Sequence, residues 1–296
     1  MTATPDAEVQ VDEPLLRALL ESQQPDLAHL PIRALDAGWD NLMIRLGEDL
    51  IVRLPRRAVA AQLIEHEQRW LPALTSRLPV PISAPVRTGV AQHGYPWSWS
   101  ILPYFDGTTV DKMPLGGDQA QALANFLIAL HQPAPNDAPV NSVRGGKLAD
   151  RAAAFEERAV RIRAKTSCLT PALERCWRSA VDLPLALDRH WLHGDLHARN
   201  VLARNQSMQA VIDWGDITAG DAATDLASVW MLLGSQTARD SALASYGADD
   251  ELRLRAMGWA ILFGVMLLDT GLVDHPAHAQ MGRVTLARLD EDLCRV

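Results

Sequence analysis

Apolar and polar residues alternate along the first part of the chain, as is typical of β-strands. Apolar side chains recur at every second position over residues 42–46 and 50–54, and the turn Gly47-Glu48-Asp49 separates the two runs. This spacing predicts a β-hairpin. Two further apolar stretches, 84–91 and 97–102, predict additional strands.

A helical pattern over residues 58–74 carries a carboxylate on its apolar side. Glu67 shares one stripe with Leu63, Trp70 and Leu74 at helical spacing. That stripe is expected to face the interior, where a carboxylate needs a cationic partner. We therefore expect the first hundred residues to form a sheet of about five strands with one packed helix.

The pattern becomes mostly helical after the polar break at Phe105-Asp106-Gly107-Thr108. Apolar residues then recur at helical spacing over seven stretches, which are 118–131, 147–165, 171–181, 223–234, 241–246, 250–270 and 278–294. A short amphipathic helix is also predicted ahead of the sheet, beginning at Pro14. The sequence therefore indicates a β-rich part followed by a helical part.

A polar loop between two short apolar runs carries the candidate chemistry. Asp195 and Asn200 lie five residues apart in this loop. A later apolar run, residues 210–212, is followed directly by Asp213. The polar turn Arg204-Asn205-Gln206-Ser207 between them predicts a hairpin. Such a hairpin would bring the three side chains to one end.

Oxygen ligands of this kind suit Mg²⁺, a hard cation that takes one or two carboxylates together with substrate phosphates. The spacing also matches the arrangement used for phosphoryl transfer. There, one Asp takes the proton of the acceptor hydroxyl, and an Asn five residues on and a second Asp hold the metals that bridge the nucleotide phosphates.

The composition narrows the classes of function. The 296 residues are 48% hydrophobic and 22% charged, with a net charge of −8, which argues against a nucleic-acid partner because such proteins usually show a basic face. Three unevenly spaced cysteines without a CxxC pair favour a reducing, cytoplasmic location over a disulfide scaffold. No signal region precedes residue 14, and the longest apolar run, Gly258 to Leu268, is too short to cross a membrane.

The loop motifs carry a family resemblance. The run from His193 to Asn200, His-Gly-Asp-Leu-His-x-x-Asn, together with Ile212-Asp213-Trp214-Gly215, resembles the aminoglycoside phosphotransferase family of small-molecule kinases. The resemblance implies an α+β, two-lobed protein-kinase-like fold. Residues 1–103 would form an antiparallel-sheet N-lobe that covers the nucleotide, and residues 104–296 a mostly helical C-lobe with the catalytic loop, the metal loop and the acceptor pocket.

The resemblance also implies roles for the loop residues. Asp195 would be the catalytic base, which orients the acceptor hydroxyl and takes its proton late. Asn200 and Asp213 would be the Mg²⁺ ligands. His193 would hold the loop backbone, and Asp225 would accept hydrogen bonds from the buried N–H groups of the loop.

Nucleotide contacts are expected in the N-lobe. Arg53 occupies the strand position of the phosphate-binding Lys of kinases, with Glu67 as its ion-pair partner, although Arg and Lys are not interchangeable at phosphates. Adenine would use the Pro103 carbonyl and the Phe105 N–H. A G-x-G-x-x-G motif is absent, and in the segment Gly38-Trp39-Asp40-Asn41 we expect Asn41 to contact phosphate. The plain alternatives are a surface strand residue for Arg53 and an ordinary turn around Asn41.

The predicted function is therefore the ATP- or GTP-dependent phosphorylation of a hydroxyl on a small molecule, either an antibiotic such as an aminoglycoside or macrolide, or a metabolite. The sequence does not specify the acceptor or the oligomeric state. Acidic residues that could contact a cationic acceptor are more often solvated charges; they are Asp216, Asp221, Asp269, Asp274, Asp290, Glu291 and Asp292.

Two alternatives use the same residues differently. One is a catalytically inactive nucleotide-binding protein on this fold, since a fold does not determine a function. The other is a metallohydrolase whose metal is bound by His193, Asp195 and His197 at alternate positions. That alternative leaves Asn200 and Asp213 without roles.

Overall fold

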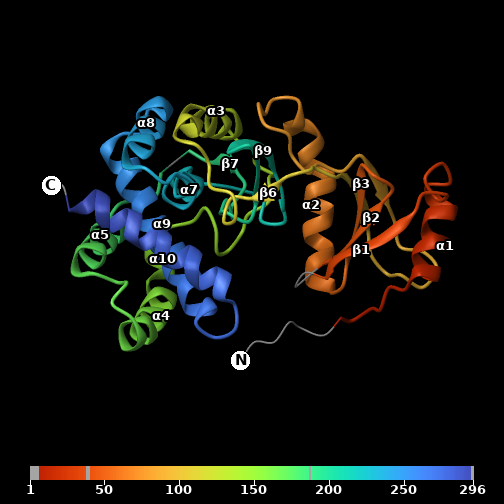
Figure 1. Ribbon diagram of the computed structural model, residues 1–296, viewed down its shortest axis with the longest axis horizontal. Helices are drawn as coiled ribbons and strands as arrows, with labels where there is room; N and C mark the ends of the chain where they lie inside the picture. Colours follow the sequence, from red (N-terminus) through yellow and green to blue (C-terminus); the bar gives the residue numbers. More distant parts are fainter. Residues whose placement is uncertain (1–6, 38–40, 187, 295–296) are drawn as a thin grey trace. The chain divides into compact units, whose positions relative to one another are not determined.

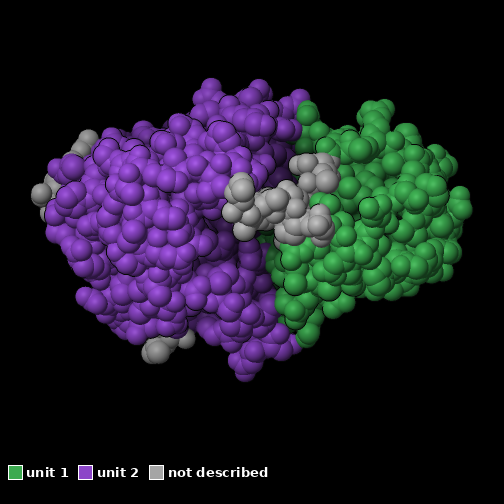
Figure 2. All heavy atoms as spheres, turned by 90° about the horizontal axis from the view of Figure 1, so that it is seen from below, with its two compact units in different colours: residues 1–77, 81–106, 213–215 green, residues 78–80, 107–212, 216–296 purple. Residues whose placement is uncertain are grey.

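The computed structural model describes residues 7–37, 41–186 and 188–294 (Figure 1). The chain divides into two compact units, coloured separately in Figure 2. Unit 1 is drawn from residues 1–77, 81–106 and 213–215, and unit 2 from residues 78–80, 107–212 and 216–296. The segment that carries Asp213 thus belongs to unit 1, although it is distant from the rest of that unit in sequence.

Unit 1 is built on a five-stranded antiparallel sheet of order β1-β2-β3-β5-β4, as the alternation predicts. Its strands are β1 (Ile32–Ala37), β2 (Asn41–Leu46), β3 (Leu50–Pro55), β4 (Arg87–Gly89) and β5 (Trp99–Pro103). The predicted hairpin is β2 with β3, in a register that pairs Met43 with Arg53. Strand β4 is shorter than the predicted stretch 84–91, and β5 is shifted toward the C-terminus relative to the predicted stretch 97–102.

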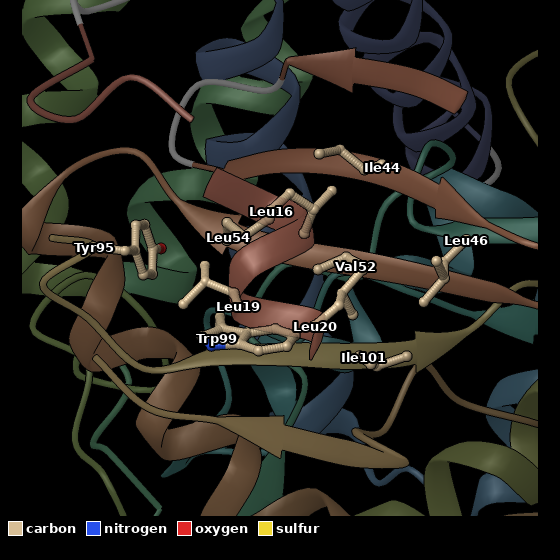
Figure 3. Packing of buried hydrophobic residues seen from close by; sticks show 10 residues of the cluster. All are labelled: Leu16, Leu19, Leu20, Ile44, Leu46, Val52, Leu54, Tyr95, Trp99 and Ile101. Carbon is tan, nitrogen blue, oxygen red and sulfur yellow. The ribbon is translucent and has the colours of Figure 1, made fainter. Parts of the chain in front are cut away.

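Two helices pack on this sheet, so the expectation of one packed helix is incomplete. They are α1 (Glu13–Gln23) and α2 (Ala58–Thr75). Figure 3 shows the leucines of α1 against Val52 of β3 and Trp99 and Ile101 of β5, all of them buried. Leucines at positions 16, 19 and 20 of α1 make the apolar stripe that this packing requires.

Helix α2 packs on the other face of these strands. Successive strand residues point to opposite faces, so the residues that alternate with the α1-facing ones point toward α2. Arg53 lies between Val52 and Leu54 in sequence but turns toward α2, where it contacts Glu67. One strand away, Ser100 accepts a hydrogen bond from Gln68 of α2 at 3.1 Å. The period-2 pattern therefore places a polar position of β3 under the helix.

Unit 2 is mostly helical, as predicted. Its helices are η1 (Gly117–Gln119), α3 (Ala120–Leu130), η2 (Leu148–Arg151), α4 (Ala152–Lys165), α5 (Pro171–Val181), α6 (Ala223–Leu226), α7 (Ser228–Leu232), α8 (Gln236–Tyr246), α9 (Asp250–Gly271) and α10 (Pro276–Leu293). The largely apolar α9 packs against α4, α5, α6 and α10 (Figure 1). Among the described residues, no helix is both long and apolar enough to cross a membrane.

One helix begins earlier than its apolar pattern indicates. The pattern places a helix at 241–246, but α8 begins at Gln236 because the Ser235 side chain accepts a hydrogen bond from the Ala238 N–H at 3.2 Å. A serine N-cap of this kind satisfies an N–H group that would otherwise lack a partner.

The strands of unit 2 form two small antiparallel sheets, β6-β8-β9 and β7-β10. They are β6 (Thr108–Thr109), β7 (His190–Leu192), β8 (Val201–Arg204), β9 (Ser207–Val211) and β10 (Thr218–Gly220). The predicted hairpin is β8 with β9, and its two turn residues, Asn205 and Gln206, have φ of 52° and 63°. Positive φ at both central positions is typical of the type I′ turn, one of the two common two-residue hairpin turns.

Candidate active site

The loop after β7 is held through its backbone by one buried carboxylate. Asp225 of α6 accepts hydrogen bonds from the His193 N–H at 2.6 Å and the Gly194 N–H at 2.9 Å. The carboxylate is almost completely buried. Hydrogen bonds from N–H groups to an ionised acceptor are stronger than neutral ones. The Asp225 carboxylate therefore fixes the backbone at the start of the loop.

The His193 imidazole fixes the same loop from its interior. Its Nδ1 accepts from the Asp195 N–H at 3.2 Å, and its Nε2 lies 3.0 Å from the Ile212 carbonyl oxygen. A carbonyl can only accept, so these partners assign the proton to Nε2. His193 thus links the Asp195 backbone to the end of the β8–β9 hairpin.

Asn200 closes the loop at its other end. Its Nδ2 donates to the Asp195 carbonyl at 2.9 Å, and its own carbonyl accepts from the Ile212 N–H at 2.9 Å. The amide nitrogen is therefore used inside the loop, which leaves the amide oxygen as the atom that can bind a cation. Asp213 is the next residue along the chain from Ile212.

Only glycine fits at position 194. Its φ is +85°, and a Cβ there would lie 2.5 Å from the Asp216 carbonyl oxygen. A larger side chain would face both a disfavoured backbone conformation and a clash with backbone. The close approach accounts for the Gly in the motif, at the place where protein kinases have Arg.

An arginine and a histidine flank the Asp195 carboxylate, which is 26% exposed. Arg144 Nη2 lies 3.0 Å from its Oδ1, and His197 Nε2 lies 3.5 Å from its Oδ2. Burial alone would raise the pKa of Asp195, but the interactions with His197 and Arg144 outweigh it and lower the pKa. Asp195 is therefore ionised at neutral pH.

Sequence reasoning missed the segment that supplies Arg144. The segment also carries Asn141, whose Nδ2 donates to Asp216 Oδ1 at 2.6 Å. Burial and the nearby charge of Asp195 raise the pKa of Asp216. The available signal was an Arg followed directly by two glycines between helical patterns, which indicates a chain forced into a close backbone approach.

In unit 1, Arg53 forms the centre of a polar cluster. Its guanidinium lies 2.8 Å from Glu67 Oε1 and 3.2 Å from Asp213 Oδ1, and both Arg53 and Glu67 are buried. In the amide orientation that its hydrogen bonds favour, the Asn41 oxygen accepts from Arg53 Nη2 at 3.0 Å. Arg53 is thus a buried strand residue and not an exposed one.

Burial acts differently on the pKa values of Arg53 and Glu67. Burial would lower the pKa of Arg53, but the charges of Glu67 and Asp213 outweigh it and raise the pKa, so Arg53 stays protonated. Burial raises the pKa of Glu67 to about 7, because desolvation exceeds the opposing effect of Arg53 and Asp213 adds a like charge.

Asp213 differs from the other acids in backbone and exposure. Its φ is +61°, in the left-handed region that non-glycine residues rarely adopt. Its side chain is 60% exposed, although one oxygen contacts Arg53. Strained backbone of this kind clusters at functional sites, where the surrounding structure holds it in place.

The predicted adenine contacts lie at the end of β5. Pro103 is its last residue and stands opposite Leu50 of β3. The next N–H, of Tyr104, donates to the Asp49 carbonyl at 2.7 Å, and Phe105 is half-buried. The roles of Pro103 and Phe105 remain predictions. Gly38, Trp39 and Asp40, predicted near the nucleotide, lie outside the described residues.

Comparison with known proteins identifies the family. The model of the phosphotransferase enzyme family, APH, matches residues 31–260. The chain belongs to this family.

Solved structures of phosphotransferases share its fold. The GDP and kanamycin complex of APH(2″)-IIIa aligns with a TM-score of 0.67 at 19% identity, covering 94% of this chain and 98% of that one. The macrolide 2′-phosphotransferase MphH from Brachybacterium faecium aligns with a TM-score of 0.56 at 19% identity, covering 87% and 93%. The chain therefore has the kinase-like fold that its motifs predict.

A curated relative is similar over part of its length. Stress response kinase A of Escherichia coli strain K12 is 27% identical over 200 residues. The match covers 62% of this chain and 55% of the relative, so it spans about half of that protein.

The site of this phosphotransferase-family chain does not suit the metallohydrolase alternative. Both ring nitrogens of His193 are used, by the Asp195 N–H and the Ile212 carbonyl. The Nδ1 of His197 accepts from the Arg199 N–H at 3.3 Å. Over the described residues, no group of three or more His, Cys, Asp or Glu side chains could hold a metal ion. These hydrogen bonds do not support that alternative.

Proposed function

We propose that this chain transfers the γ-phosphoryl group of ATP or GTP to a hydroxyl of a small molecule. The observation that carries the proposal is the Asp195 loop. Its backbone is fixed by Asp225, His193 and Asn200, while the Asp195 carboxylate remains ionised and partly exposed. An acid held in this way is suited to position a hydroxyl for in-line attack.

Asp195 would act mainly by orientation. Phosphoryl transfer passes through a loose transition state, so the hydroxyl keeps its proton until late and a strong base is not needed. A carboxylate with a lowered pKa fits this role, because it accepts a hydrogen bond throughout and takes the proton as the O–P bond forms.

The residues present fit a role for Mg²⁺. Asn200 offers an amide oxygen, and Asp213 offers an exposed carboxylate held in an unusual backbone conformation. Two such hard oxygen donors are typical of Mg²⁺ sites completed by substrate phosphates and water. When bound, Mg²⁺ would neutralise the charge that develops on the transferred phosphoryl group.

The cluster of Arg53, Glu67 and Asn41 would bind the nucleotide phosphates. Arg53 is held by Glu67, as the Lys of kinases is held by a helix Glu. The Pro103 carbonyl and the Phe105 N–H would pair with the base. Solved structures with this fold include GDP and ATP complexes of aminoglycoside phosphotransferases, which supports a nucleotide co-substrate.

A nucleotide-consumption assay tests the proposal. The protein would be given MgATP and MgGTP with a panel of hydroxylated antibiotics and primary metabolites, and product would be followed by phosphorus NMR. We expect the wild type to convert at least one acceptor to a phosphoester. Asp195→Ala should give no detectable phosphoester with any acceptor in the same assay. Nucleotide binding without transfer to any acceptor would favour the inactive alternative, and the antibiotics test a role in resistance.

A further inference from the structure

Arg144 holds a buried hydrogen-bond donor without an acceptor. Its side chain is 12% exposed, and its Nη2 contacts the Asp195 carboxylate. Within the part of the chain that the structure describes, its Nε is buried and has no hydrogen-bond partner. Leaving a buried donor unsatisfied is costly, so each such group in a native structure calls for an explanation.

The position of Arg144 is built into the fold. The next residue, Gly145, approaches Gly220 of β10 so closely that a Cβ on Gly220 would lie 2.4 Å from the Gly145 carbonyl oxygen. That oxygen accepts from the Asp221 N–H at 2.9 Å. The Arg144 guanidinium also stacks over the Phe263 ring at 4.9 Å. The backbone and side chain are therefore both anchored beside Asp195.

The acidic side chains considered as contacts for a cationic acceptor have partners of their own. The contacts are Asp216 with Asn141, Asp221 with Arg255, Asp269 with Arg161, Asp274 with His275, Asp290 with Thr170, and Glu291 and Asp292 with Arg239. Each of these carboxylates therefore already has a neighbouring donor or cation, which lowers the negative charge it can offer to a polycation.

Arg199 is a second cation in the sequence of the loop, and it contacts the neutral side chain of His278. Arg199 Nη1 lies 3.0 Å from His278 Nε2. Burial and the charge of Arg199 lower the pKa of His278, so its imidazole is neutral at pH 7 and accepts this hydrogen bond. Arg199 is therefore a second cation in the loop that carries Asp195, and its recorded contact is with a neutral group.

We propose that Arg144 binds an anionic group, a carboxylate or a phosphate, that the acceptor carries beside the hydroxyl to be phosphorylated. This inference rests on the proposed function. The anion would take the Nε–H and Nη2–H fork, a geometry that suits bidentate binding of carboxylate or phosphate. Arg144 would thereby release Asp195 Oδ1 for the hydroxyl proton.

The transfer step then balances in a simple way. The acceptor oxygen forms a bond to the γ-phosphorus, the bond from that phosphorus to the β–γ bridging oxygen breaks, and the nucleoside diphosphate leaves. The hydroxyl proton passes to Asp195. A polycationic amino sugar would be opposed by Arg144 at the same place.

The unsatisfied N–H can be observed directly. We would label arginine with ¹⁵N, assign the Arg144 Nε–Hε signal by its absence in Arg144→Lys, and titrate the full chain with MgADP present. The probes would be glycerate, glycerol 3-phosphate, glycerol and kanamycin. We expect a saturable shift with glycerate or glycerol 3-phosphate, and the stronger of the two identifies the anion. No shift with either anion, or an equal shift with glycerol or kanamycin, would overturn the proposal.

Substitutions provide the second readout. Arg144→Lys and Arg144→Gln should weaken binding of the preferred anion by about tenfold or more, as expected for the loss of a charge-assisted fork. Arg253→Lys, at an exposed arginine paired with Asp240, is the matched control and should bind as the wild type does. Thermal unfolding of each variant shows whether it is folded. Equal anion affinity in folded Arg144→Gln and wild type would refute the site.

The two proposals fail in different ways. If the wild type does not bind MgATP, or transfers phosphate to no acceptor in the panel, the proposed function fails. If it phosphorylates kanamycin or a neutral acceptor more efficiently than any anionic one, the proposed function stands and only the role of Arg144 fails.

Discussion

Two acidic segments of this chain are held in opposite ways. The loop from His193 to Asn200 is fixed by internal hydrogen bonds and by Asp225, and the carboxylate of Asp195 is mostly covered. Asp213 lies in left-handed backbone with its side chain 60% exposed. This difference matches the roles that we propose for the two acids, because a base must be placed accurately, whereas a metal ligand must be open to its cation and phosphates.

Their cationic neighbours differ in the same sense. Arg144 and His197 face Asp195 and keep it ionised. Arg53 faces Asp213 but also binds Glu67, whose burial raises its pKa to about 7. The first arrangement lowers the pKa of one acid, and the second keeps a buried arginine protonated, which is the cation that we propose for phosphate binding. The following experiments test this contrast, beginning with the largest expected effect.

Removal of the proposed base should have the largest effect on turnover. Asp195→Ala is expected to lower kcat by about 10³-fold, within the range found for general acid–base groups. Steady-state assays with the acceptor identified in the screen measure this. Asp26→Ala, at an exposed turn, is the control and should retain wild-type kcat. Unchanged turnover in Asp195→Ala would contradict its assignment.

Removal of the loop anchor should affect stability as well as activity. Asp225→Ala leaves the His193 and Gly194 N–H groups buried without their acceptor. At about 1–3 kcal/mol for each unsatisfied group, we expect the free energy of unfolding to fall by roughly 2–6 kcal/mol. Urea denaturation measures this change. Asp225→Asn, which keeps one acceptor oxygen, should lose less; equal stability of Asp225→Ala and wild type would show that the anchor is unimportant.

Replacing Arg53 by the lysine typical of kinases should have a moderate effect. Lys retains the charge but cannot contact Glu67, Asp213 and Asn41 through one planar fork. We expect KM for MgATP to rise about tenfold in Arg53→Lys, corresponding to the loss of one charge-assisted hydrogen bond, with kcat less affected. An unchanged KM would indicate that Arg53 acts only as a point charge.

The smallest expected effect is a change in pH dependence. Because the pKa of Glu67 is about 7 when folded and near 4.5 when exposed, the folded chain keeps a proton that the unfolded chain has lost between these values. This group therefore stabilises the fold fully below pH 4.5, and its contribution falls as pH rises toward 7, by up to about 1.4 kcal/mol per pH unit.

Denaturation of Glu67→Gln at pH 5, 6 and 7 checks this sign. The variant cannot titrate at this position, so its unfolding free energy should fall less than that of the wild type over the same range. A steeper fall in the variant would contradict the raised pKa of Glu67.

Much of the fold could be predicted because its signals are local. The alternation around Arg53 specified the β2–β3 hairpin, and the polar turn before Ser207 specified the β8–β9 hairpin. The packing of α1 on the sheet was missed, because an amphipathic stripe does not reveal what covers it. The early start of α8 was missed because a serine cap lies outside the apolar pattern.

The site shows the same division between local and distant signals. Asp195 and Asn200 lie in one motif, so their spacing was informative. Arg144 lies 51 residues from Asp195, in a segment without hydrophobic periodicity. Its placement depends on the contact between Gly145 and Gly220, and no local pattern encodes that contact. One of the groups that lower the pKa of Asp195 therefore comes from a segment distant in sequence.

Calorimetric titration of ATP into the wild type, Asp195→Ala and Asp213→Ala, each with and without Mg²⁺, tests most directly whether the two acids have separate tasks. Asp195→Ala should bind MgATP within a few-fold of the wild type and with the same dependence on Mg²⁺. Asp213→Ala should lose the Mg²⁺-dependent part of nucleotide binding. Wild-type affinity and Mg²⁺ dependence in Asp213→Ala, or equal losses in both variants, would contradict this account.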